Sequence, residues 1–366
     1  MEEHKRIVFY TYSTNIYISS LKVNIMTHAE FKSAARQHQI DFKVNDPEIN
    51  VPTDRFPVRT LRKNGREYRI DVESSLRWED CRDANGDYRI FFSGFRHEIT
   101  EAVNGRMFST KGQMVTNLLR SEHIPYNIFY PMQHDKEGAA HLFNSIMGEN
   151  KIAEINNIEI EYNPGGLKDG TSFDVYVEYT PLDCKYGEKG GIGIEVKYTE
   201  KEYPVQRGSK EWEETHNASG IHLADNYRIP SKESGWFKDK FIADVPFADE
   251  KKLTVHVAAN RYRQIWRNHI LGASMLLGLC PREDDKLSEF TSLTVYPQGN
   301  GHFSDVWASY ESMLTSSGLA TFRHLTYEEL FPLMHDLLDG NKIPNLSEWI
   351  NYLNRRYIVG KQTEAR

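Results

Sequence analysis

The amino-acid sequence predicts an α/β protein in which a mixed β-sheet is flanked by helices. The main observation is a run of three strand-like segments at residues 155–162, 172–179 and 192–198, which are rich in β-branched and aromatic residues. Helix-like patterns precede this run at residues 109–124 and follow it at residues 255–279. Such a mixed order of helices and strands is typical of a sheet covered by helices.

The chain before residue 109 is expected to form an N-terminal extension and a small β-rich subdomain. Residues 67–72 and 88–92 alternate between apolar and polar residues as strands do. An Asn-Gly dipeptide at residues 85–86 indicates a turn between them. The chain is therefore predicted to divide into two structural units, residues 1–108 and 109–366.

Helix signals dominate the rest of the chain. Gly148 and Pro281 end two of the predicted helices, because glycine favours a helix end and proline cannot continue a helix. A long polar stretch at about residues 203–253 is predicted to be an insertion, whose role the sequence leaves open. A further strand is expected at residues 290–296. Further helices are predicted at residues 27–40, 137–147, 305–314, 327–338 and 347–357.

The composition excludes several classes of protein. Hydrophobic residues at 39% and charged residues at 27% are typical of a globular protein, and no apolar run is long enough to span a bilayer. Acidic residues at the N-terminus argue against a signal peptide. The chain has three cysteines that lie far apart in the sequence, Cys81, Cys184 and Cys280, which argues against a disulfide framework and against a structural zinc site. A reducing cytoplasm is therefore the simplest compartment for this protein. The net charge of −7 gives no global support to nucleic-acid binding, so a protein that binds nucleic acid with this charge would need a local basic track.

Three charged residues interrupt two of the predicted strands. Glu195 and Lys197 are spaced i, i+2 within an apolar segment, so they lie on the same face of a strand. Asp174 interrupts the preceding strand, and a hairpin between the two strands would place it beside Glu195. Because burying such groups without partners is costly, these residues are candidates for a catalytic centre.

Two carboxylates on adjacent strands are typical of a site for a divalent cation that prefers oxygen ligands, above all Mg²⁺. Such a cation lowers the pKa of a bound water and neutralises charge on a phosphodiester. Lys197 would orient or help to deprotonate the attacking water, or stabilise the pentacovalent phosphate.

Asp174 on one strand and residues 195–197 on the next resemble the motif of the PD-(D/E)XK nuclease superfamily. The predicted order of helix, three strands, helix and strand agrees with that family's core. Residues 195–200 and 262–268 also resemble uncharacterised bacterial members. Phe173 stands where the family has a proline, so the first half of the motif is incomplete.

The resemblance implies a restriction-endonuclease-like fold, with residues 109–366 as the catalytic domain. It also implies that the chain is a restriction-like endonuclease that hydrolyses DNA phosphodiester bonds with Mg²⁺ or Mn²⁺, and that Asp174 and Glu195 are metal ligands. Further candidates are two carboxylates for the metal shell and one amide that faces the site: Glu161, Glu122 and Gln264.

Two clusters of basic residues are candidates for contacts with phosphates. One lies within residues 55–69 with aromatic residues interleaved, and the other lies beside Trp266. Each cluster is either part of a DNA groove or a solvated charged surface. The residues predicted to contact DNA are Arg59, Arg62, Lys63, Arg66, Arg261 and Arg263.

Alternatives to an active DNA endonuclease remain open. An acid-x-Lys tripeptide also occurs elsewhere in the chain, and an exposed Glu195–Lys197 ion pair would contribute little to stability. The alternatives are a catalytically silent DNA-binding module of the same fold and an α/β protein in which Glu195 and Lys197 form a structural ion pair. The sequence also leaves open the recognition sequence, the form of the nucleic acid, and whether a homodimer makes the cuts.

Overall fold

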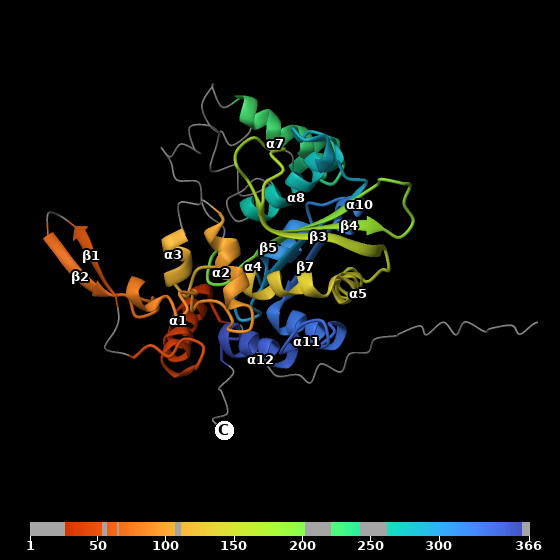
Figure 1. Ribbon diagram of the computed structural model, residues 1–366. Coiled ribbons are helices and arrows are strands. Elements are labelled where there is room, and N and C mark those ends of the chain that lie inside the picture. The colour runs from red at the N-terminus through yellow and green to blue at the C-terminus, as the bar shows by residue number, and fades with distance from the viewer. Residues whose placement is uncertain are drawn as a thin grey trace, which may run out of the picture.

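A five-stranded mixed sheet forms the centre of the computed structural model, with the strand order β3-β4-β5-β6-β7 (Figure 1). The pairs β3–β4 and β4–β5 are antiparallel, whereas β5–β6 and β6–β7 are parallel. The predicted α/β fold is confirmed. The strands are β3 (Ile152–Tyr162), β4 (Phe173–Pro181), β5 (Gly190–Val196), β6 (Glu289–Tyr296) and β7 (Phe322–Thr326). The structure describes residues 26–52, 57–63, 66–106, 111–201, 221–241 and 262–360.

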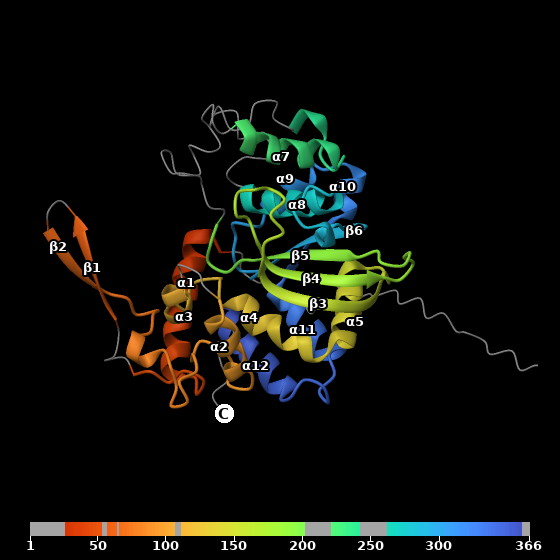
Figure 2. The same ribbon diagram turned by 45° about the horizontal axis from the view of Figure 1, so that its top comes forward.

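One face of the sheet is covered by helices from both ends of the chain (Figure 2). α5 packs on β3, α11 packs on α5, and α1 packs on α12. α1 begins at a capping box in which Thr27 and Glu30 each accept a hydrogen bond from the other's backbone amide. The apolar residues of this layer form a first hydrophobic core, which extends from Phe31 to Ile358. The helices are α1 (His28–Asn45), α5 (Lys136–Met147), α11 (Tyr327–Leu337) and α12 (Leu346–Tyr357).

The opposite face is covered by a second layer, in which α8 packs against β5 and β6 (Figure 2). A second hydrophobic core lies here and contains Phe173, Trp266 and Phe290. On this face β5 carries glycines, and a Cβ atom at Gly193 would lie 2.3 Å from the Phe173 ring. The glycines therefore make room for aromatic rings beside the sheet. The helices are α7 (Ile221–Glu233), α8 (Arg263–Leu276), α9 (Val306–Glu311) and α10 (Ser316–Ala320).

The N-terminal part contains a hairpin of β1 (Val58–Lys63) and β2 (Arg66–Asp71), which form a two-stranded sheet of their own. Three short helices follow the hairpin. Residues 64–65, between the two strands, lie outside the described residues. A turn is present at the predicted place, where Gly86 donates its amide to the Asp83 carbonyl at 3.1 Å, but it lies between the bridged residues Arg82 and Tyr88 and does not join two strands. The helices are α2 (Arg96–Asn104), α3 (Lys111–Thr116) and α4 (Ile124–Ile128).

The strand predicted at residues 88–92 is wrong. Only Tyr88 makes an isolated bridge there, and the segment otherwise consists of turns and bends. The carbonyl of Ile90 accepts hydrogen bonds from the side chains of Asn127 and Arg356 instead of from a neighbouring strand. Side chains from distant elements thus satisfy this backbone, which removes the need for a strand partner.

Most other predicted elements are confirmed within a few residues. Of the helix predicted at residues 255–279, α8 covers Arg263–Leu276, and residues 255–261 lie outside the described residues. The helix predicted at residues 109–124 is instead α3, a turn and the start of α4, and the prediction missed β7 and α7. Part of the predicted insertion at residues 203–253 lies outside the described residues. The first core joins residues on both sides of residue 108, so independent folding of residues 1–108 stays a prediction.

Candidate active site

Three carboxylates lie in a row across β3, β4 and β5. Val175 pairs with Ile160 on β3 and with Ile194 on β5, which fixes the register of the three strands. Residues directly opposite each other in antiparallel strands share one face. One position further along, the strands carry Glu161, Asp174 and Glu195.

Glu161 has an unusual backbone conformation, with φ at 57° in the left-handed region. A residue with a Cβ atom adopts this region at a cost, and such residues cluster at functional sites. Glu161 is exposed, whereas Asp174 is half-buried. Glu161 is therefore the more exposed residue as a whole, although its carboxyl group lies against protein atoms.

Glu195 and Lys197 form a buried ion pair. Their exposed fractions are 6% and 2%, so the pair is not the exposed surface contact that would contribute little. The Lys197 ammonium donates to Oε1 of Glu195 and to the side-chain oxygen of Gln264 on α8. Asn268, one helical turn further along α8, donates from Nδ2 to Oε2 of Glu195. Each oxygen of Glu195 therefore has a donor.

A cavity of about 180 Å³ opens beside these groups. Arg267 on α8 borders it and is held by Asp169, with 2.6 Å between Nη2 and Oδ2. Tyr227 donates to the same carboxylate oxygen. The cavity thus contains both carboxylates and a positioned guanidinium. The residues that line it are Thr171, Ser172, Asp174, Glu195, Gln264, Arg267 and Asn268.

Burial, and after it the crowding of like charges, sets the electrostatics of the row. Burial, followed by the charges of Glu195 and Glu161, raises the pKa of Asp174 well above its usual value, although Val196 donates its backbone amide to Asp174 at 2.7 Å. Neighbouring protein atoms desolvate the Glu161 carboxyl, and together with the charges of Glu195 and Glu122 they raise its pKa to about 7. Both carboxyls therefore favour a proton, or another cation, in the folded protein.

This donor set fits a divalent cation of the Mg²⁺ type. Asp174 and Glu161 supply oxygen ligands whose mutual repulsion a cation would relieve. Each oxygen of Glu195 keeps a second lone pair after accepting its hydrogen bond. Across the described segments, no three histidine, cysteine, aspartate or glutamate side chains are already arranged as a set of metal ligands. A cation would therefore have to draw the carboxylates closer together.

The structure brings Asp174, Glu195, Lys197, Glu161 and Gln264 to one place, as the sequence predicted. Their catalytic and metal-binding roles stay predictions. Sequence analysis did not select Asn268 as a site residue. Two signals could have identified it: it ends the segment 262–268 that resembles family members, and it lies four residues after Gln264, on the same face of a helix.

Glu122 lies near the row, but its predicted place on a helix is wrong, because it lies in a turn between α3 and α4. It forms an ion pair with Arg120 and contributes its charge to the environment of Glu161. Arg263 is only 2% exposed, whereas Arg261 lies outside the described residues. The hairpin residues predicted to contact DNA lie on β1 and β2 and are Arg59, Arg62, Lys63 and Arg66.

Comparisons with known proteins support one assignment. Neither the curated proteins nor the solved structures contain a match to this chain. None of the helices in the described segments has the length and apolar character needed to cross a membrane. The family model of the PD-(D/E)XK nuclease superfamily matches residues 27–359, nearly the whole chain. The chain therefore belongs to the PD-(D/E)XK nuclease superfamily.

Proposed function

We propose that this chain is a metal-dependent endonuclease that hydrolyses DNA phosphodiester bonds at the site formed by Asp174, Glu195 and Lys197. The observation that carries the proposal is the buried Lys197 ammonium, held by Glu195 and Gln264 beside Asp174. Burying charged groups costs free energy even when they are paired, and buried ionisable groups beside a cavity are typical of functional sites.

Asp174 and Glu195, with Glu161 at the outer edge, would hold a divalent cation. When bound, the cation would supply Lewis acidity to the phosphate and lower the pKa of the attacking water. Asn268 fixes the orientation of Glu195 through its amide nitrogen. This contact keeps the carboxylate in place when charge develops in the site.

Lys197 would place a positive charge next to the phosphate as negative charge accumulates in the transition state. A preorganised charge in a site that excludes water contributes more to catalysis than the same charge in solvent. Gln264 limits the freedom of the ammonium, because its side-chain oxygen accepts from Nζ. Arg267 is held by Asp169 at the rim of the cavity, and its guanidinium would be a second positive group that orients the phosphate.

The alternative is a DNA-binding module of the same fold that has lost cleavage. The carboxylates and the lysine of the motif are present and adjacent. A module that binds without cutting would have no need for a buried acid and ammonium at this place. We therefore propose that the chain is an active nuclease, and more specifically that it has a restriction-like role in the cytoplasm.

The test is cleavage of plasmid DNA by the full chain, with Mg²⁺ and with a chelator. We expect cleavage with Mg²⁺ only, and a loss of about 100-fold or more in Asp174→Asn and Lys197→Met. Glu178→Gln is a matched control, because Glu178 lies on the same strand as Asp174 and pairs with Lys189 at 3.3 Å, outside the cavity. Full cleavage by both site variants would overturn the proposal. Binding of DNA without cleavage, with or without Mn²⁺, would favour the silent module.

A further inference from the structure

A buried carboxylate outside the family motif supports the wall of the active-site cavity. Asp169 lies in the loop between β3 and β4, and its side chain is only 6% exposed. Its Oδ1 accepts the backbone amide of Thr171 at 2.8 Å. Its Oδ2 accepts hydrogen bonds from Nη2 of Arg267 at 2.6 Å, from Oγ1 of Thr171 at 2.7 Å and from the hydroxyl of Tyr227. The carboxylate of Asp169 therefore joins its own loop to α7 and α8.

The backbone around Asp169 has an unusual conformation. Lys168 before it and Gly170 after it both have positive φ angles, of 57° and 81°. A residue with a Cβ atom adopts this region at a cost, and does so where the surrounding contacts determine it. Burial alone would raise the pKa of Asp169, but the charge of Arg267 and the hydrogen bonds that Asp169 accepts lower it below its usual value. The loop thus holds a charged carboxylate in a fixed place.

These contacts fix the orientation of the Arg267 guanidinium. Its Nη2 donates both to Asp169 and to the hydroxyl oxygen of Thr171, so both hydrogens of this nitrogen are engaged. The Thr171 hydroxyl donates its one hydrogen to Asp169. Because a guanidinium is planar and rigid, holding one nitrogen in two directions sets the plane of the whole group. Arg267 and Thr171 both line the cavity that contains Asp174 and Glu195.

Tyr227 connects α7 to this arrangement. α7 packs on the side of α8 that faces away from the sheet (Figure 2). The buried ring of Tyr227 lies against Trp266 of α8, with 5.5 Å between the ring centroids, and Ser231 of α7 accepts a hydrogen bond from the Trp266 indole. Among the described residues of α7, none lines the cavity. Tyr227 therefore reaches the site indirectly, through Asp169.

We propose that Asp169 and Tyr227 are positioning residues, which fix the Arg267 guanidinium so that it binds a phosphate of the substrate strand in one orientation. This inference rests on the proposed function and adds two residues that lie outside the family motif. A guanidinium binds a phosphate through paired N–H groups, so its contribution depends on its plane as well as on its charge. A misplacement of about 1 Å in such a group lowers the rate by about 100-fold.

A matched pair of tyrosine variants tests the proposal. Tyr227→Phe removes the hydroxyl that donates to Asp169 and keeps the ring. Tyr179→Phe is the control, because Tyr179 is also buried and its hydroxyl donates to the carboxylate of Glu289 at 2.8 Å, away from the residues that line the cavity. Each variant loses one hydrogen bond to a carboxylate. A purely structural role would therefore affect the two variants alike.

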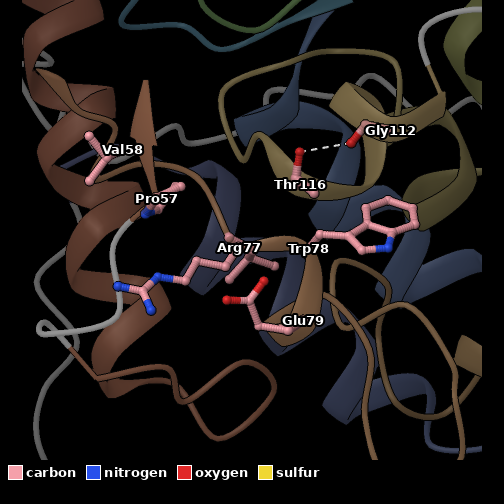
Figure 3. Close-up of a pocket in the computed structure, with 8 residues that line it drawn as sticks. Pro57, Val58, Arg77, Trp78, Glu79, Gly112 and Thr116 are labelled. Atoms are coloured by element: carbon pink, nitrogen blue, oxygen red, sulfur yellow. Dashed lines mark hydrogen bonds between the residues drawn. The ribbon is translucent and has the colours of Figure 1, made fainter. Parts of the chain in front are cut away.

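A second pair compares two threonines that line different cavities. A cavity of about 540 Å³ lies at the root of the hairpin, and Thr116 lines it (Figure 3). The hydroxyl of Thr116 donates to the carbonyl of Gly112 at 2.7 Å, within α3 (Figure 3). Thr171, in contrast, contacts Arg267. Thr171→Val and Thr116→Val each replace such a hydroxyl by a methyl group, and the proposal predicts an effect on cleavage for Thr171→Val alone.

Cleavage would be measured as kcat/KM on supercoiled plasmid with Mg²⁺, at a temperature well below the Tm of every variant. We expect Tyr227→Phe and Thr171→Val to lower kcat/KM about tenfold, and the controls Tyr179→Phe and Thr116→Val to stay within about twofold of the wild type. Arg267→Gln should lower it about 100-fold. In that background Tyr227→Phe should change it by no more than about twofold, since residues that act through one group are not additive, whereas independent effects multiply.

Nuclear magnetic resonance of isotope-labelled arginine provides a readout that does not depend on cleavage. The guanidinium signals of Arg267, assigned with Arg267→Lys, should show slow rotation about the Nε–Cζ bond in the wild type. The rotation should become faster in Tyr227→Phe and stay slow in Tyr179→Phe.

Two kinds of failure are distinguishable. Equal effects of the two tyrosine variants, or a tenfold loss from Tyr227→Phe that persists in the Arg267→Gln background, would overturn the positioning role while the wild-type chain still cleaves DNA. A wild-type chain that does not cleave DNA with Mg²⁺ would overturn the proposed function and, with it, the phosphate assigned to Arg267.

Discussion

Lys197→Met removes the ammonium from the buried pair while keeping most of the side-chain volume. Glu195 then keeps Asn268 as a donor but loses the opposite charge that offsets its burial. Breaking a buried pair by removing one partner costs about 3–5 kcal/mol, because the remaining charge is left uncompensated. We therefore expect the free energy of unfolding to fall by about this amount.

The double variant Glu195→Gln/Lys197→Met should recover much of the lost stability, since it leaves no isolated charge. Gln264 loses its hydrogen bond from the ammonium both in Lys197→Met and in the double variant, so this loss cancels when the two are compared. The expected coupling energy is of order 1–3 kcal/mol. Urea denaturation at pH 7 without divalent metal, followed by circular dichroism, measures all four members of the cycle.

The pair of Glu178 and Lys189 is the control for this cycle. Its side chains are 22% and 34% exposed and its atoms are 3.3 Å apart, so it should contribute less than about 1 kcal/mol. A coupling energy near zero for Glu195 and Lys197, equal to that of the control, would refute the reasoning. Cleavage should be absent from both the single and the double variant, which separates the loss of activity from the loss of stability.

Two further predictions concern the same site, and a third concerns the packing of α8 on the sheet. Asp174→Asn should stabilise the metal-free protein at pH 8, because it removes a buried charge that lies beside the carboxylates of Glu195 and Glu161. Differential scanning calorimetry measures this effect. The same variant should abolish cleavage in the plasmid assay. For Glu161, a folded pKa of about 7 against an ordinary 4.5 means that its own contribution to metal-free stability is fully present below about pH 4.5 and is lost as the pH rises through about 7. The increase in Tm on adding Mg²⁺ should therefore grow over that range, and this growth should shrink in Glu161→Gln. Gly272→Ala should destabilise the protein by about 1–3 kcal/mol, because the added Cβ would lie 2.0 Å from the ring of Phe290 on β6. Urea denaturation measures this change, and an unchanged midpoint would contradict the close packing of α8 on the sheet.

The sequence was sufficient to predict the central strands and the site motif because both depend on local periodicity. The i, i+2 spacing of Glu195 and Lys197 places them on one face of any strand, whatever the rest of the fold. Asp174 needed only a short connection between consecutive strands to come opposite Glu195. These features are therefore visible in a single sequence.

Other parts depend on contacts between distant residues. Asn268 reaches Glu195 across 73 positions of the chain, and its place on the same helix face as Gln264 does not by itself show that it contacts the carboxylate. The segment around Ile90 resembles a strand in composition, but its carbonyl is satisfied by side chains from Asn127 and Arg356. The left-handed backbone of Glu161 likewise follows from its place in the sheet, since glutamate has no intrinsic preference for that conformation.

The arrangement of the two hydrophobic cores has a consequence for inactivation. Asp174 and Glu195 stand on strands of the central sheet, whereas Gln264 and Asn268 belong to α8, in the layer around the second core. Proteins open in cooperative parts before they unfold globally. If the α8 layer opens first, the carboxylates lose their organising amides while the first core stays folded. Activity would then disappear at a lower temperature than secondary structure, and hydrogen exchange would show α8 amides opening ahead of those of β5.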